Sequence, residues 1–198
     1  LTALGYQALA DNTASYNTAV GHLALRFNTT GRNTAYGNTS LYANTTGSIN
    51  TAIGDNSLVA NTTGNYNTAL GYQSLASNTT ASNNTAVGYA ALFDNTTGTS
   101  LTALGVNALA NNTTANNNVA VGYNTLLTNT IGATNVAVGW QALYDNTTGS
   151  LNVAVGAEAL VNNTTASHNT AVGWQSLKTN TTGTNNVALG NQALQANT

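Results

Sequence analysis

Glycine occurs in this chain only at two positions of one short repeat, and the repeat runs through the whole sequence. Twelve of the 19 glycines follow Ala and an apolar residue, and the other seven follow Thr-Thr or Thr-Ile. The first set, Gly5 to Gly190, is spaced by 16, 16 and then nine times 17 residues. Such a period is typical of one small unit stacked many times, each unit contacting only its neighbours. We therefore expect residues 1–198 to form one continuous solenoid of twelve coils.

Composition narrows the functional classes. Charged residues make up 4% of the chain, against roughly 25% in average proteins, so there is no basic footprint for nucleic acid. No apolar run approaches the ~20 residues of a membrane helix, and without cysteine there are no disulfides or thiolate metal sites. Hydrophobic residues make up 41% and recur at fixed places, which favours an ordered solenoid over a disordered tract. The chain lacks methionine and begins and ends within a repeat, so we expect a segment of a longer protein.

The first part of each repeat predicts a short strand. Three positions never vary: Ala two before the first glycine, Leu four after it and Asn seven after it. The stretch Asn-(Thr/Val)-Ala-(Val/Leu/Ile)-Gly places β-branched residues on one face of a strand and the fixed Ala on the other. A site that accepts only Ala indicates a close neighbour, so we expect both strand faces to be covered.

The middle part of the repeat leaves two alternatives open. Residues one and five after the glycine, such as Trp140 and Tyr144, have the i, i+4 spacing of a helix, and Gln, Ala and Leu are good helix formers. A second strand fits equally well. The fold class expected is therefore all-β, with or without short helical turns: a parallel β-solenoid or β-roll of twelve 16–17-residue coils.

The stretch Asn-Thr-Thr-(Gly/Ala) predicts the turn, because Asn and Gly tolerate left-handed backbone. Ala replaces the glycine in four coils, at Ala14, Ala81, Ala115 and Ala166, so a positive φ is not obligatory there. Stacking would align the turn asparagines into a ladder of amide hydrogen bonds. The first two coils lack one turn residue.

These repeats resemble a known family. Asn118 to Gly122 and Asn186 to Gly190 are similar to the head repeats of trimeric autotransporter adhesins, the YadA-like heads. The wider unit resembles repeats of phage tail-fibre and related surface proteins. The resemblance covers all twelve units and implies a left-handed parallel β-roll with three chains packed around an axis. The adhesin repeat is shorter, about 14 residues, and its second half is more strand-like.

No catalytic, cofactor or metal site is expected, and we expect no enzyme activity. Asp11, Asp94 and Asp145 share a repeat position, but they belong to coils that lie several strand spacings apart. The histidines, His22 and His168, occupy different repeat positions without an acidic partner. These polar residues fit solvated substitutions in a permissive repeat.

One row of residues is a candidate glycan contact, because an aromatic ring beside an amide can stack on a sugar and bond its hydroxyls. The same rings could instead cover an apolar edge or an interface between chains. Thr-Thr pairs suggest ice binding only weakly, and Asn-Thr-Thr sequons fit the turn better than glycosylation. The candidate residues are Tyr6, Gln7, Tyr72, Gln73, Trp140, Gln141, Trp174 and Gln175.

The function expected from the sequence is mechanical. The chain fits a structural fibre segment, the shaft or head of an extracellular adhesin or phage tail fibre, located on a cell surface or virion. The expected partners are further copies of the chain as a trimer, and a cell-surface glycan or host receptor. The alternatives are a subunit of a self-polymerising extracellular filament and a glycan-binding solenoid that uses the aromatic row.

Overall fold

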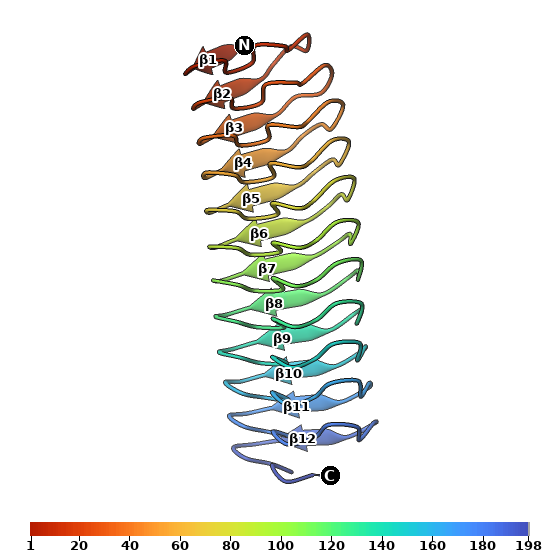
Figure 1. Cartoon of the computed structure of the whole chain (residues 1–198). Coiled ribbons are helices and arrows are strands. Elements are labelled where there is room, and N and C mark those ends of the chain that lie inside the picture. The colour runs from red at the N-terminus through yellow and green to blue at the C-terminus, as the bar shows by residue number, and fades with distance from the viewer. Residues whose placement is uncertain (198) are drawn as a thin grey trace.

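A computed structural model describes residues 1–197 as a single stack of coils, each contributing one short strand to the same side (Figure 1). The strands point in one direction and form a twelve-stranded parallel sheet in chain order, β1 to β12. They are β1 Thr2–Leu4, β2 Thr18–Val20, β3 Thr34–Tyr36, β4 Thr51–Ile53, β5 Thr68–Leu70, β6 Thr85–Val87, β7 Thr102–Leu104, β8 Val119–Val121, β9 Val136–Val138, β10 Val153–Val155, β11 Thr170–Val172 and β12 Val187–Leu189. The all-β parallel solenoid expected from the repeat is confirmed.

Every strand pairs in register with the next, so equivalent residues form straight rows along the stack. Ala86 pairs with Ala103, for example, and Ala103 with Ala120. Because the whole unit repeats in register, position in the repeat predicts position in space. Below, a row is named by its offset from the glycine that follows the strand: the strand occupies offsets −3 to −1, and the invariant Leu is at +4.

Glycine at the end of each strand is required by both backbone conformation and space. All twelve have φ between 126° and 137°, a region that side chains rarely adopt. A Cβ on Gly156 would lie 2.6 Å from the carbonyl oxygen of Gly173 in the next coil. The turn glycines are different, since only Gly31 of the seven has a positive φ. This agrees with the Ala residues found at that position in other coils.

The middle of the repeat is neither strand nor helix, so both alternatives considered for it are wrong. Residues at +2 and +4 have left-handed backbone in all twelve coils, and the buried invariant Leu is one of them, with φ of 54° at Leu92. The adjacent coils supply the hydrogen bonds: Ala90 N–H donates to the Tyr72 carbonyl and Leu92 N–H to the Ala108 carbonyl, both at 3.0 Å. This backbone is unusual for non-glycine residues and costs ~1 kcal/mol or more each. Repeated bonding between coils offsets that cost.

The core is thin and lies inside the coils. The fixed Ala at −2 points inward and packs with the Leu row, as Ala86 and Leu92 do at 0% exposure. The close neighbour of the fixed Ala is therefore its own chain. A single chain covers only one face of the strands, because offsets −3 and −1 point outward and none of the −1 residues is buried. Coverage of the other face stays a prediction.

Two buried rows of asparagine complete the interior. In the turn row, at +7, each Nδ2 donates to Oδ1 of the preceding asparagine, as Asn95 does to Asn78 at 3.1 Å, and also to a backbone carbonyl of its own turn. This row is continuous from Asn12 to Asn197 and confirms the predicted ladder. The Asn of the turn sequons is therefore buried and hydrogen-bonded, as Asn44 is at 0% exposure.

The second row was not predicted. The Asn before each strand, at −4, accepts the backbone N–H of its counterpart in the next coil, as Asn135 Oδ1 does from Asn152 at 3.0 Å. Its Nδ2 donates to a turn carbonyl, Gly149 for Asn135 at 2.9 Å. Buried amides are stable only when both ends are satisfied. Within residues 1–197, no buried side-chain nitrogen or oxygen lacks a partner.

Leu101 interrupts this second ladder and leads to a stability prediction. Leu101 N–H still donates to Asn84 Oδ1, but its side chain offers no acceptor to the buried N–H of Asn118, which has no other acceptor among the described residues. Leu101→Asn would satisfy that N–H, worth ~1–3 kcal/mol, and so offset the lost burial of the Leu side chain. We expect the free energy of unfolding to change by less than ~1 kcal/mol. Leu92→Asn, which offers no such bond, should cost ~3 kcal/mol or more. Denaturant unfolding of both variants tests this, and equal losses would contradict it.

Candidate functional site

Two exposed features of the coil are candidates for function: the outer face of the sheet and the row of side chains just beyond the strand ends. The outer face carries offsets −3 and −1. All twelve residues at −1 are apolar and solvent-accessible, including Tyr36 at 58% and Leu70 at 44% exposure. Offset −3 is Thr in β1 to β7 and β11, and Val in β8 to β10 and β12. The sheet therefore presents an uncharged surface that becomes most apolar over β8 to β10.

The row beyond the strand ends, at +1, holds the predicted glycan-contact rings. Tyr6, Tyr72, Trp140 and Trp174 are all exposed, with Trp140 and Trp174 at 47% each. Tyr72 stacks on Tyr89 with ring centroids 5.4 Å apart. The register thus brings the aromatic residues onto one row, and Tyr89 and Tyr123 extend the predicted set. Their role as sugar contacts stays a prediction.

The amides paired with these rings, at +2, are less accessible. Gln7, Gln73 and Gln141 are half-buried, and Gln175 is 9% exposed. Gln175 donates to Glu158 Oε2 at 3.0 Å and accepts from Gln195 at 2.9 Å. Lys178, at +5 of the following coil, also bonds Glu158, at +2. Row +2 of one coil therefore lies beside row +5 of the next. Hydrogen bonding from Lys178 is the main cause that lowers the pKa of Glu158.

A shallow hollow lies between rows +2 and +5 in the middle of the stack. It has a volume of about 330 Å³ and is lined by Tyr89 and Phe93 together with the amides of Gln73 and Asn107. Small residues, Ala90 at +2 and Ala110 at +5, replace the larger side chains of other coils, and this opens the hollow. It carries no charged lining residue.

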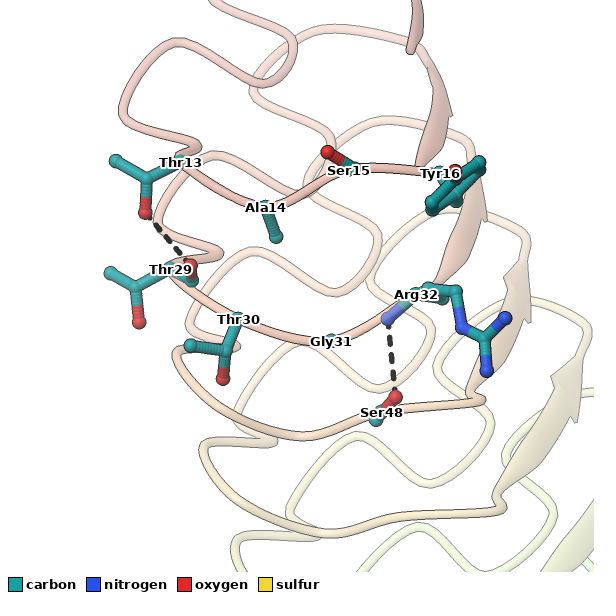
Figure 2. A pocket seen from close by; sticks show the side chains of 9 residues that line it. All are labelled: Thr13, Ala14, Ser15, Tyr16, Thr29, Thr30, Gly31, Arg32 and Ser48. Atoms are coloured by element: carbon teal, nitrogen blue, oxygen red, sulfur yellow. Dashed lines mark hydrogen bonds between the residues drawn. The ribbon is translucent and has the colours of Figure 1, made fainter.

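A second hollow lies over the two shortened coils (Figure 2). It is about 440 Å³, open to solvent, and bounded by the turn threonines Thr13, Thr29 and Thr30 at one end and by Tyr16 and Arg32 at the other. The threonine directly after each turn Asn bonds the next coil, as Thr13 Oγ1 does to the Thr29 carbonyl at 2.7 Å. Where a second threonine follows, it is exposed, as Thr30 is. One threonine hydroxyl in each of these turns thus helps to hold adjacent coils together.

The isolated polar residues are placed as follows. Asp11 pairs with Arg26 at 3.0 Å on the surface, and Asp94 and Asp145 lie in the same row five and eight coils further on. His22 stacks on Tyr6, and its Nδ1 is 2.9 Å from Asn38 Oδ1. Among residues 1–197, no three His, Asp or Glu side chains gather as metal ligands would. In the same range, no helix could span a membrane.

Comparison with known proteins adds no relative: no family model, curated protein or solved structure matches the chain.

Proposed function

We propose that the chain is a structural segment of an extracellular fibre on a cell surface or virion, the shaft or head of an adhesin or phage tail fibre. In this proposal, copies associate side by side as a trimer through the outer face of the sheet. The observation that carries it is the uninterrupted row of accessible apolar residues at −1. Soluble monomers rarely expose apolar patches larger than a few hundred Å², and larger patches mark interaction surfaces.

The composition of this face supports association between copies. The outward strand residues carry no charge in any of the twelve strands, so two copies of the face meet without desolvating an ion. The strongest contacts are expected over β8 to β10, where both outward residues of each strand are Val. Interface cores are typically depleted of charged residues in the same way.

The mechanical part of the proposal rests on the interior. Backbone bonds between in-register strands and the asparagine ladders run along the axis from coil to coil. A force that stretches the rod along its axis would therefore be shared by all the hydrogen bonds between two adjacent coils. Length then scales with the number of coils, at ~4.8 Å for each.

A charge placed on the outer face tests the association. Val138→Lys would put an ammonium group into the centre of the proposed interface, where an unpaired buried charge costs several kcal/mol. We expect the wild type to sediment as a trimer and Val138→Lys as a monomer with unchanged circular dichroism. Thr97→Lys, on the exposed turn, is the matched control and should remain a trimer. A wild type that sediments as a monomer at all concentrations would contradict the proposal.

The runner-up is a filament that grows end to end. β1 and β12 each pair on one side only, and unpaired strand edges can template pairing with another chain. In that arrangement, Val138→Lys would leave assembly intact, so the same experiment distinguishes the two.

A further inference from the structure

The two tryptophans of the chain lie on either side of one small residue of the +1 row, and the position between their side chains is called the gap below. Trp140 and Trp174 lie two coils apart, and Ala157 is the residue between them. The register here is set by backbone bonds, since Glu158 N–H donates to the Trp140 carbonyl at 2.8 Å and Gln175 N–H to the Ala157 carbonyl at 2.9 Å. With a strand spacing of ~4.8 Å, the two tryptophan backbones are roughly 10 Å apart. A small residue thus separates two large, exposed rings.

A preorganised polar group borders the gap. Glu158 follows Ala157, and its side chain is 17% exposed. Lys178 and Gln175 both donate to Oε2, and no described residue donates to Oε1. Gln141, beside Trp140, makes no side-chain hydrogen bond within the described part of the chain and is half-buried. The gap therefore has a fixed, free acceptor on one coil and a free amide on the preceding coil.

The charge at the site limits the class of ligand. Glu158 and Lys178 form an ion pair, so their charges cancel locally. No other charged residue occupies offsets +1 or +2 in the coils of Trp140, Ala157 and Trp174. The site thus combines apolar rings with hydrogen-bonding groups and has no net charge. This combination suits a ligand with hydroxyl donors and an apolar ring face.

We propose that the gap between Trp140 and Trp174 is a binding site for a neutral saccharide. One sugar ring lies over Ala157 between the two indoles, a hydroxyl donates to Glu158 Oε1, and the Gln141 amide bonds a neighbouring hydroxyl. Where aromatic residues occupy adjacent coils of the row no such space is left, because Tyr89 follows Tyr72 directly and stacks on it. Binding at this site is independent of the association proposed above.

The chain provides its own reporter for this site. Trp140 and Trp174 are its only tryptophans, so a change in tryptophan fluorescence reports on this site. The whole chain is titrated with neutral oligosaccharides, namely β-1,4-glucan, α-1,4-glucan, mannan, galactan and N-acetylglucosamine oligomers, and with an acidic oligogalacturonate. We expect a saturable change with at least one neutral oligomer.

Two variants and a matched control test the geometry. Ala157→Tyr fills the gap with a residue that the row carries in other coils, and should weaken binding at least tenfold. Glu158→Gln keeps the size of the side chain but replaces the charged acceptor, and should weaken binding about tenfold. Val106→Tyr makes the same kind of change on the same row outside the gap and should leave the affinity unchanged. Circular dichroism and sedimentation of each variant confirm that fold and assembly are retained.

The site is disproved if no neutral oligomer gives a saturable change, if only the acidic oligomer does, or if Ala157→Tyr binds as the wild type does. None of these results bears on association through the sheet face, because sedimentation of the same samples measures that separately.

Discussion

Asn95→Asp is expected to unfold the centre of the solenoid at neutral pH. Asn95 is fully buried, and its Nδ2 donates to Asn78 Oδ1 at 3.1 Å and to the Gly98 carbonyl at 3.0 Å. A carboxylate would place an oxygen against both acceptors and bury a charge without a counter-ion. We expect a loss of ~3–5 kcal/mol in the free energy of unfolding. Thermal and denaturant unfolding followed by circular dichroism measure it.

The pH dependence of this variant has a definite sign. Burial disfavours the ionised carboxyl, so its pKa in the folded chain lies above the unfolded value of ~3.9. The proton is therefore released more readily by the unfolded chain, and the destabilisation grows as pH rises above that value. The loss should be smaller near pH 4 than at pH 7.

The matched control for this variant is Asn111→Asp. Asn111 is exposed and occupies the row in which Asp11, Asp94 and Asp145 already occur. We expect its stability to stay within ~0.5 kcal/mol of the wild type. Equal melting of Asn95→Asp and the wild type at pH 7 would contradict the role given to the ladder.

Gly88→Ala is the second substitution with a large expected effect. Gly88 has φ of 137°, and a Cβ there would lie 2.6 Å from the carbonyl carbon of Gly105 in the next coil. The obstacle is backbone, which cannot move without breaking the register of the stack. We expect a loss of ~3–5 kcal/mol from strain and overpacking together.

The control for this variant is Gly64→Ala at the turn. A Cβ on Gly64 would also meet backbone, the carbonyl oxygen of Ala81 in the next coil, but Gly64 does not have a positive φ. Because the next coil holds Ala81 itself at the equivalent position, we expect a cost of ~1–2 kcal/mol from overpacking alone, less than that of Gly88→Ala. If both variants lose the same free energy of unfolding, the positive φ of Gly88 is not what makes glycine necessary at the end of the strand.

The strand rows, the glycine that ends each strand and the turn ladder could be predicted from sequence, because each depends on a residue type that occurs mainly in one structural setting. Alternation around a fixed Ala indicates a strand, and a recurring Asn in a stacked turn indicates a ladder. The left-handed Leu could not be predicted in this way. Leu favours right-handed helix in isolation, and only bonds to neighbouring coils stabilise it at φ near 50°.

The second ladder and the outer face carried signals that were open to two interpretations. Asn recurs before ten of the twelve strands, but an Asn at a strand start also fits an exposed turn. The fixed Ala indicated a close neighbour without saying whether that neighbour belonged to the same chain. The candidate sugar site depends on Ala157, a small residue whose effect is visible only once Trp140 and Trp174 are known to share its row.

Small-angle X-ray scattering of the wild-type chain tests side-by-side association most directly, because it measures the cross-section and the length of the particle separately. We expect the length of one solenoid with the cross-section and mass of three chains. A particle with the cross-section of one coil would contradict it: with greater length it would be the end-to-end filament, and with the length of one chain it would be a monomer.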